Sequence, residues 1–369
     1  MPSLSVMIKP ASSLCNMRCE YCFYHSLSQA REKYSYGVMS ESTALSIIQK
    51  ATEFADGAPL HFAFQGGEPT VAGLDFFRFF VKTVKETETK SQASFSLQTN
   101  GLLIDNEWAK FFAENKFLIG LSLDGDIESN QYRVDADGKS TTERVIRASE
   151  ILDARGVPFN ILSVVTKKSL ERLDNVFDFY EKHNFKYLQF IPCLKPFGVE
   201  SDSYAMNEEE FSTFLIGAWK KYERAFYERK PLSIRFFDNL LMMAMGNRAE
   251  QCGLYGRCGI QSIIEANGDV FPCDFYCLDE WKLGNIKEMS FREIGTCERA
   301  GKFIAESLPV RQECKSCDYY KVCLGGCKRY LSDLDYCKVM KTFFKEVYPS
   351  LQKIATNIKQ MKSPTLQNC

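Results

Sequence analysis

Residues 4–22, LSVMIKPASSLCNMRCEYC, determine the predicted architecture. A short β-rich apolar run at 4–8 leads into a loop that carries Cys15, Cys19 and Cys22. A structural zinc site or an electron-transfer cluster takes four protein ligands, so three thiols leave one metal position open. Barrel folds place their chemistry at the C-terminal ends of strands, where this loop lies. The alternative is a zinc knuckle completed by a distant Cys or His.

Downstream of this loop, short apolar runs alternate with longer amphipathic stretches up to about residue 195. This pattern is typical of repeated βα units and a parallel sheet. Six strands are predicted, at 4–8, 60–64, 94–97, 118–123, 159–165 and 187–191. Helices are predicted at 41–54, 74–87, 105–115, 141–155 and 168–183, the first with Ser40 and the last with Ser169 as N-cap. Six strands with intervening helices predict an α/β fold with a partial (β/α)6 barrel.

The character of the sequence changes after the barrel. Helices are predicted from about 206 to 228 and over 238–245, and cysteines then accumulate from Cys252 onward. The run 263–271, IIEANGDVF, predicts a hairpin that turns at Asn267-Gly268. The tail at 338–359 predicts another amphipathic helix. We place the boundary between two domains in the 230–250 region, as 1–235 and 236–369.

Composition excludes several classes of protein. The chain has 369 residues, 46 Lys+Arg against 47 Asp+Glu, and a formal net charge of −1. It lacks the basic excess typical of nucleic-acid-binding proteins, so no nucleic-acid partner is expected. No stretch approaches the roughly 20 apolar residues of a membrane span, and the N-terminus does not resemble a signal peptide. We therefore expect a cytoplasmic protein with no membrane partner.

The 15 cysteines require a different explanation from disulfides. An odd number cannot be fully paired, and cytosolic thiols are kept reduced. With only three histidines, an extensive metal site must be mostly sulfur, which indicates zinc or iron–sulfur clusters.

The first cysteine motif resembles a known family. Cys-x3-Cys-x2-Cys with an aromatic residue before the last Cys is similar to the signature of radical S-adenosylmethionine enzymes. The resemblance implies a [4Fe–4S] cluster on Cys15, Cys19 and Cys22, with S-adenosylmethionine on the open iron. Reduction of the cluster then cleaves the cofactor, and the resulting 5'-deoxyadenosyl radical abstracts a substrate hydrogen.

Other segments agree with this resemblance. The stretch FQGGEP at 64–69 resembles the family's GGEP motif, and its glycines allow close backbone approach to a ligand amino group. Polar groups follow later strands: Gln98, Asn100, Ser122 and Asp124. The resemblance implies that the following residues bind S-adenosylmethionine: Tyr21, Gly66, Gly67, Glu68, Ser122, Arg133 and Leu194. The ordinary alternative for each is strand-end capping or surface solvation.

The C-terminal cysteines follow a second pattern. The order Cys-x9-Gly-x4-Cys, gap, Cys-x2-Cys-x5-Cys-x3-Cys, gap, Cys resembles the SPASM extension, a short hairpin with loops and helices that binds two auxiliary [4Fe–4S] clusters. The resemblance implies a first auxiliary set of Cys252, Cys258, Cys273 and Cys327. It implies a second of Cys314, Cys317, Cys323 and Cys337. Two zinc sites with four thiolates each would account for the same eight cysteines. We interpret the other four as ordinary hydrophobic or surface thiols: Cys193, Cys277, Cys297 and Cys369.

Within the SPASM group the sequence is most similar to anaerobic sulfatase-maturating enzymes. The matching segments include 62–77, FAFQGGEPTVAGLDFF, and 270–276, VFPCDFY. The resemblance implies oxidation of Cys or Ser to Cα-formylglycine in a Cys/Ser-x-Pro-x-Arg segment of an unfolded sulfatase, with a flavodoxin- or ferredoxin-type electron donor. It implies Asp274 as the catalytic base, for which the ordinary alternative is a solvated loop aspartate. Tyr24 and Gln65 are expected to hold the substrate peptide.

Two other functions compete with this one. A SPASM maturase of a ribosomally made peptide, which forms a thioether, a carbon–carbon bond or an epimer, would share the fold and clusters. Such maturases often carry an N-terminal leader-binding domain, for which the position of Cys15 is expected to leave no room. A zinc-stabilised binding module would explain the C-terminal cysteines but not the three-cysteine motif followed by GGEP.

Overall fold

The computed structural model describes residues 3–87, 90–200 and 202–362. The chain forms two compact units, each assembled from non-contiguous segments. The first contains Met1–Leu162, Pro196–Glu200 and Gly259–Ala305, and the second contains Ser163–Lys195, Ser201–Cys258 and Glu306–Cys369. Residues 259–305 thus pack with the N-terminal half, whereas the predicted boundary groups them with the C-terminal domain.

Among the described residues of the first unit, the strands have the order β10-β9-β8-β1-β2-β3-β4-β5, and β5 continues into the second unit from Ser163 on. Strands β1 to β5 are parallel to their neighbours, and β8 is parallel to β1. The remaining pairs, β8 with β9 and β9 with β10, are antiparallel. The strands are β1 Leu4–Ile8, β2 Leu60–Phe64, β3 Ala93–Thr99, β4 Leu118–Ser122, β5 Phe159–Val165, β8 Ile263–Ile264, β9 Asp269–Phe271 and β10 Gly284–Asn285.

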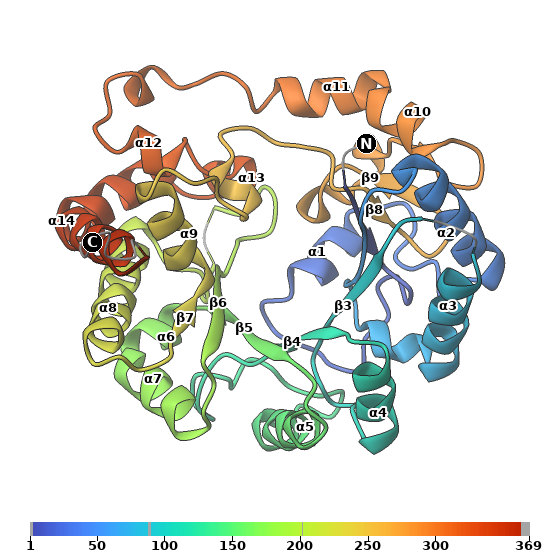
Figure 1. Cartoon of the computed structure of the whole chain (residues 1–369), viewed down its shortest axis with the longest axis horizontal. Helices are drawn as coiled ribbons and strands as arrows, with labels where there is room; N and C mark the ends of the chain where they lie inside the picture. The colour runs from blue at the N-terminus through green and yellow to red at the C-terminus, as the bar shows by residue number, and fades with distance from the viewer. Residues whose placement is uncertain (1–2, 88–89, 201, 363–369) are drawn as a thin grey trace, which may run out of the picture. The chain divides into compact units, whose positions relative to one another are not determined.

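The helices of the first unit are α1 Phe23–Gln29, α2 Glu41–Ala55, α3 Leu74–Glu86, α4 Asn106–Glu114, α5 Thr142–Ala154, α10 Phe291–Thr296 and α11 Glu298–Ala305. Of these, α2 to α5 lie along the outside of the parallel strands (Figure 1), and α10 contacts α2 and α11. Alternate residues of β2 are buried, and Phe62 and Phe64 pack against Phe77 and Phe80 of α3. The opposite strand face is therefore left for polar side chains.

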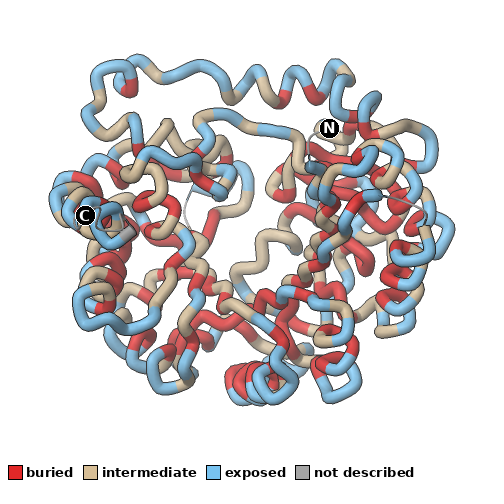
Figure 2. The backbone as a smooth tube through the Cα atoms, in the orientation of Figure 1, coloured by how far each residue is buried: buried red, intermediate tan, exposed pale blue. Residues whose placement is uncertain are grey.

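In the second unit, β6 Tyr187–Pro192 pairs in parallel with β7 Ser233–Ile234. Its helices are α6 Lys167–Glu171, α7 Leu173–Lys182, α8 Glu208–Tyr227, α9 Arg235–Ala244, α12 Tyr320–Cys323, α13 Lys328–Leu331 and α14 Tyr336–Lys362. The long helix α14 lies beside α8 and α9 (Figure 1). Trp219, Phe237 and Phe343 join these three helices in a buried aromatic core. Buried residues concentrate in strands and on the inner faces of helices (Figure 2).

The six strands predicted from sequence are all present, with ends that differ by at most two residues. Ser40 is the N-cap of α2 as predicted, and its side chain accepts from the Thr43 amide at 3.2 Å. The predicted helix at 168–183 is wrong as a single element, because the helix breaks at Arg172. Ser169 is not its N-cap. Thr166 occupies that position, and Ser169 is the third helical residue, whose hydroxyl accepts from the Thr166 amide.

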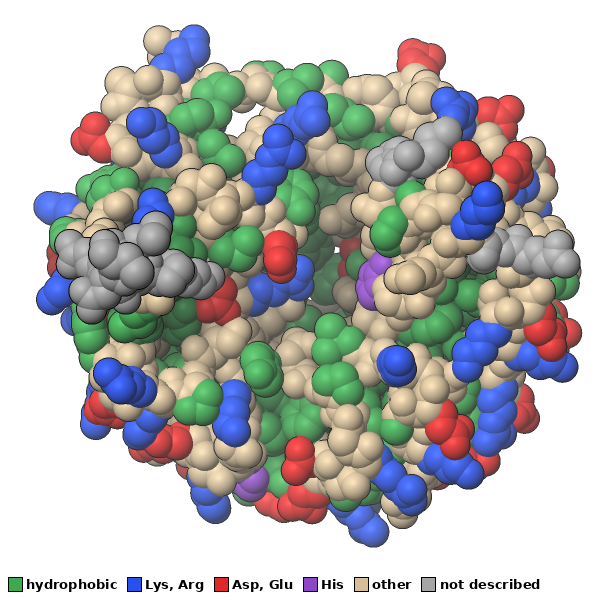
Figure 3. Space-filling model, in the orientation of Figure 1, with side chains coloured by type: hydrophobic (Ala, Val, Ile, Leu, Met, Phe, Trp, Pro, Cys, Tyr) green, Lys and Arg blue, Asp and Glu red, His purple; other side chains and the backbone are tan. Residues whose placement is uncertain are grey.

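The predicted hairpin at 263–271 is confirmed as β8 and β9, with Gly268 in the left-handed region at φ +95°. The tail helix is confirmed and is longer than predicted. No helix in the described ranges is long and apolar enough to cross a membrane. Acidic and basic side chains are interspersed over the face shown in Figure 3.

Candidate active site

The three-cysteine loop follows β1 directly. Cys22 is the N-cap residue of α1, and its amide donates to the Cys19 carbonyl at 3.2 Å. Asn100, at the end of β3, donates to Asn16 Oδ1 at 2.7 Å and so ties the loop to the sheet. Burial raises the pKa of Cys15 to about 12 and that of Cys19 to about 11. Metal assembly must therefore displace protons from these thiols.

The donor set of this loop fits a cluster. The charges of Cys19 and Cys22 both act on Cys15, so the three side chains are neighbours. In a four-iron cluster each of the three thiolates would bind a different iron, and the fourth iron would stay open. The donor set therefore fits the predicted [4Fe–4S] cluster.

The GGEP turn packs against the cysteine loop. Gly67 has φ +56°, and a Cβ at this position would lie 2.5 Å from the Leu14 carbonyl oxygen. Gly66 has φ +99°, and its Cβ would lie 2.5 Å from Cε of Lys9. The Glu68 amide donates to the Leu14 carbonyl at 2.8 Å. Only glycine allows this approach of the two backbones.

The Glu68 side chain is buried and holds two strand ends together. Its carboxylate accepts from the Thr70 amide and hydroxyl, the Thr99 hydroxyl and the Asn100 amide, at 2.6–3.0 Å. Burial raises the pKa of Glu68, whereas these hydrogen bonds act to lower it. The carboxylate is committed to shaping the turn, and any contact with a cofactor has to come from its backbone.

The predicted polar groups after β4 come together in the first unit. Arg133 donates from Nη1 to the Tyr21 hydroxyl at 3.0 Å, and that hydroxyl donates to Asp124. Ser122 Oγ accepts from Gln98 Nε2 at 2.9 Å. Leu194 is buried in the second unit.

Asp274, Tyr24 and Gln65 form a second polar group, which we call the Asp274 trio. Tyr24 donates its hydroxyl to Asp274 Oδ2 at 2.5 Å, and Gln65 Nε2 lies 3.1 Å from the same oxygen and 2.9 Å from the Tyr24 hydroxyl. Asp274 is 7% exposed, so the interpretation as a solvated loop aspartate does not hold. Its Oδ1 is buried and has no hydrogen-bond partner among the described residues. One carboxylate oxygen is thus fixed and the other is left to accept a proton.

A buried ion network beside the Asp274 trio was missed by sequence reasoning. Glu265 Oε1 lies 2.7 Å from Lys9 Nζ and 2.6 Å from Arg31 Nη1, and all three side chains are at most 2% exposed. Lys9 Nζ also lies 5.2 Å from the Tyr24 ring centroid. Burial raises the pKa of Asp274, and the charge of Lys9 acts in the opposite direction. Charged residues directly after the apolar strands at 4–8 and 263–264 were the available signal.

The auxiliary cysteines divide between the two units. Cys252, Cys258 and Cys327 belong to the second unit, and the charges of the first two act on Cys327, whose pKa burial raises to about 11. Cys273 belongs to the first unit and directly precedes Asp274. The pairing of Cys273 with the other three stays a prediction.

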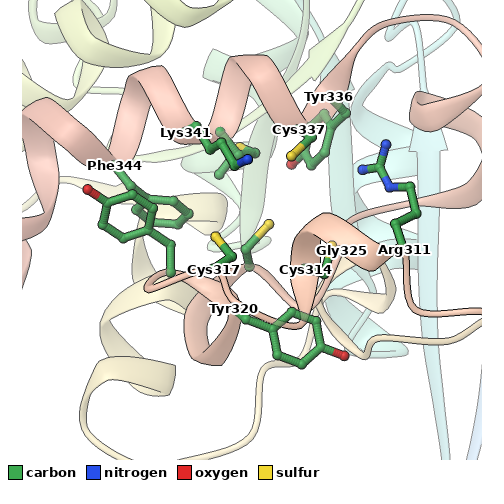
Figure 4. A pocket seen from close by; sticks show the side chains of 12 residues that line it. Arg311, Cys314, Cys317, Tyr320, Gly325, Tyr336, Cys337, Lys341 and Phe344 are labelled. Atoms are coloured by element: carbon green, nitrogen blue, oxygen red, sulfur yellow. The ribbon is translucent and has the colours of Figure 1, made fainter.

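The second auxiliary set lines a single pocket in the second unit. Cys314, Cys317, Cys323 and Cys337 all border it, together with Arg311, Tyr336 and Lys341 among others. Cys337 and Lys341 extend from α14 toward the loop that holds Cys317 (Figure 4). Burial raises the pKa of Cys323 to about 11, and the other three thiols act in the same direction. Four thiols around one space fit a fully ligated cluster.

Four cysteines lie outside the three predicted ligand sets. Cys277 is fully buried in an apolar cluster with Ile263 and Phe271, as its interpretation as a small hydrophobe predicts. Cys193 is also buried, Cys297 is partly exposed, and Cys369 lies outside the described residues.

Comparison with known proteins identifies the chain. The radical SAM superfamily matches residues 10–180, and SPASM, an iron–sulfur cluster-binding domain, matches residues 256–318. The cysteine-type anaerobic sulfatase-maturating enzyme of Clostridium perfringens is 42% identical over 97% of this chain and 100% of the relative. The serine-type enzyme of Bacteroides thetaiotaomicron is 27% identical over 98% of this chain and 93% of the relative. The structure of native anSMEcpe with bound AdoMet and Cp18Cys peptide matches with a TM-score of 0.91 and 39% identity, covering 97% of this chain and 100% of that one.

Fold and cysteine motifs together define a radical S-adenosylmethionine enzyme with a SPASM domain on an α/β fold. More narrowly, the chain belongs to the anaerobic sulfatase-maturating enzymes. As a member of that family it is an oxidoreductase that uses S-adenosylmethionine and three [4Fe–4S] clusters.

Proposed function

We propose that the protein oxidises a cysteine side chain of an unfolded sulfatase, in a Cys-x-Pro-x-Arg segment, to Cα-formylglycine, and that it acts less well on serine. The preference for cysteine is supported by the identity to the cysteine-type relative, 42% against 27% for the serine-type one. The structural observation that carries the proposal is the buried Asp274 carboxylate. Tyr24 and Gln65 hold one of its oxygens, and the other has no hydrogen-bond partner in the part of the chain that the structure describes.

The cofactor sites are proposed from the contacts described above. Cys15, Cys19 and Cys22 would hold the first cluster. S-Adenosylmethionine would be held by Tyr21, Gly66, Gly67, Ser122 and Arg133, with Glu68 shaping the turn. The part of Leu194 stays a prediction from the family resemblance. When bound, this pair of cofactors supplies the abstraction of a hydrogen atom from the substrate Cβ.

The residues of the chain then handle the proton. Two-electron oxidation of the side chain removes one hydrogen atom, one proton and one electron in total. We propose that Asp274 Oδ1 accepts the proton from the substrate thiol, since it is the oxygen without a hydrogen-bond donor. Tyr24 and Gln65 orient the carboxylate through Oδ2 and would contact the substrate peptide.

The electron that leaves the substrate requires an acceptor, and the first cluster requires a donor for the electron that cleaves S-adenosylmethionine. As the acceptor we propose auxiliary clusters on Cys252, Cys258, Cys273 and Cys327, and on Cys314, Cys317, Cys323 and Cys337. We propose a flavodoxin- or ferredoxin-type protein as the physiological electron donor, and a cytoplasmic location in which such carriers occur.

Two matched peptides test the proposal. Reduced, reconstituted enzyme with S-adenosylmethionine should convert a Cys-x-Pro-x-Arg peptide to a hydrazide-reactive aldehyde and form 5'-deoxyadenosine. The same peptide with serine should react more slowly. If the cofactor is cleaved while both peptides stay unchanged, the peptide-maturase function becomes the better one. The protein should contain about 12 iron atoms per chain, and stoichiometric zinc in place of iron would contradict the assignment.

The variant Asp274→Asn tests the base. It should keep about 12 iron atoms and the cleavage of S-adenosylmethionine, because Asp274 ligates neither. Aldehyde formation should fall by about 100-fold or more, the usual contribution of a general base. An unchanged aldehyde yield would remove Asp274 from this role.

A further inference from the structure

Helix α14 is strongly basic in a chain that is otherwise acidic. Between residues 336 and 361 it carries five lysines and one glutamate. The chain as a whole has a formal net charge of −1, so the remaining residues together carry −5. Lys338, Lys341 and Lys345 are all exposed, and their spacing of three and four residues places them on one face of the helix. None of these three lysines forms an ion pair among the described residues.

This basic face begins at the second auxiliary set of thiols. Cys337 and Lys341 lie one helical turn apart on α14, and both line the pocket that contains Cys314, Cys317 and Cys323 (Figure 4). Arg311 lines the same pocket from the opposite chain segment, and no carboxylate does so in the described structure. We call the set of Arg311, Lys338, Lys341 and Lys345 the basic rim.

Acidic residues near the pocket do not cancel the basic rim. Glu313 lies 3.4 Å from Arg311 and offsets that charge in part. On the loop at 312–323, Lys315 and Lys321 balance Glu313 and Asp318 in number. At the start of α14, Asp335 accepts a hydrogen bond from the Lys338 amide at 3.0 Å, and the charge of Lys338 acts on Glu208. These two carboxylates offset Lys338 in part, so the local excess of positive charge comes mainly from Lys341 and Lys345.

We propose that the basic rim is the docking surface for an acidic one-electron carrier protein of the flavodoxin or ferredoxin class. This inference rests on the proposed function, in which the four thiols hold an auxiliary cluster. In the contact, the cluster, reduced by the electron that leaves the substrate, loses that electron and the oxidised carrier gains it, and no bond or proton is exchanged; reduction of the enzyme by reduced carrier measures the reverse transfer through the same contact. Opposite charges around a redox site raise the association rate by about 10- to 1,000-fold at low salt, which a small, short-lived interface requires.

Two other anionic or peptidic partners fit less well. A nucleic acid would be repelled by the acidic remainder of the chain, since its binding scales with the phosphates neutralised. The proposed substrate segment contains arginine, which a basic surface disfavours. A folded carrier with a local acidic patch needs to match only the rim.

The test uses charge reversal in the cluster-loaded enzyme. The rim variant is Lys338→Glu with Lys341→Glu and Lys345→Glu. The matched control reverses three exposed lysines of the first unit, Lys82, Lys110 and Lys139, and so has the same net charge. Binding of oxidised flavodoxin is measured by titration, and reduction of the enzyme by reduced flavodoxin is followed by anaerobic stopped-flow absorbance, both at low salt and at 0.5 M salt.

The rim variant should lose about 10-fold or more in both affinity and reduction rate at low salt, and the difference should disappear at 0.5 M salt. The control should stay within about 2-fold of the original enzyme. If both variants lose equally, net charge explains the effect and the docking surface is rejected. Rim-dependent binding of heparin or RNA without an effect on flavodoxin would also overturn the proposal.

Dithionite separates this inference from the proposed function. With dithionite as reductant, the double variant Lys338→Glu with Lys345→Glu, which leaves the pocket lining unchanged, should form aldehyde at the original rate and contain the same iron. If the original enzyme forms no aldehyde with dithionite, the proposed function fails, whatever the rim does. Should Lys341→Glu reduce the iron content, the double variant Lys338→Glu with Lys345→Glu leaves the pocket lining intact and should still lose about 3-fold or more in reduction rate.

Discussion

The Glu265 network should dominate the stability of the first unit. The variant Glu265→Gln removes the single carboxylate that lies between Lys9 and Arg31, at 2.7 and 2.6 Å. Two buried cations then face each other without the carboxylate that lies between them. Removing one partner of a buried ion pair costs about 3–5 kcal/mol. The pKa of Glu265 gives a second figure: burial acts to raise it, but Lys9 and Arg31 lower it to about 2 from 4.5, which corresponds to about 3 kcal/mol.

The loss of unfolding free energy predicts a measurable shift in the thermal unfolding midpoint. With an unfolding entropy of about 2.1 cal/mol/K per residue, a loss of 3–5 kcal/mol lowers the thermal midpoint of a chain of this length by about 4–6 °C. The control is Glu114→Gln, which breaks an exposed pair with Lys110 at 3.9 Å. Exposed pairs contribute about 0.5 kcal/mol, so the control should shift the midpoint by less than about 1 °C.

The pH dependence provides a check on the sign. The folded pKa of Glu265 lies below its unfolded value, so its stabilisation is fully present above about pH 4.5 and is lost as the pH falls toward 2. The gap between the original protein and Glu265→Gln should therefore narrow between pH 5 and pH 3 in denaturation of the metal-free protein. Equal small shifts for the two variants, or a gap independent of pH, would refute this account of the network.

Three further predictions concern single positions. Gly67→Ala should raise the dissociation constant of S-adenosylmethionine, measured by titration, by about 10-fold or more. The added Cβ would lie 2.5 Å from a carbonyl oxygen, and strained backbone costs about 1–3 kcal/mol. The control Gly301→Ala, at a helical position with open space around it, should leave the dissociation constant unchanged. Glu68→Gln should lower the free energy of unfolding by about 2 kcal/mol in denaturant titrations, since it weakens charge-assisted hydrogen bonds. Cys277→Ala should retain about 12 iron atoms per chain, whereas Cys273→Ala should lose iron. Iron loss by Cys277→Ala would contradict the interpretation of Cys277 as a core residue.

Local patterns made most of the fold predictable. Strands such as 60–64 have alternating buried residues, and the Asn267-Gly268 turn has one dominant conformation, so short sequence windows suffice. The helix break at Arg172 was not predicted, because the apolar residues of 168–183 keep the helical period across it. Periodicity also does not indicate the capping box at Thr166. Short strands such as β10 were not predicted, because their pairing depends on partner strands elsewhere in the sequence.

The site was predictable to the extent that it is built from motifs. Asp274, Tyr24 and Gln65 were singled out separately, and the structure joins them through hydrogen bonds. Spacing alone could not show which carboxylate oxygen is occupied. The pairing of Lys9 with Glu265 crosses more than 250 residues, and no local pattern encodes a contact of that range.

The parallel pairing of β8 with β1 also has a consequence for assembly. Strand β1, which leads into the three-cysteine loop, pairs on its outer side with residues 263–264. A chain that ends at residue 235 lacks these residues, so β1 becomes an unpaired edge strand that contains the apolar residues Val6 and Ile8. Separate expression of 1–235 should therefore yield aggregates, whereas a product ending after residue 305 would close that margin. The segment that completes this edge of the sheet is also the one that carries Asp274.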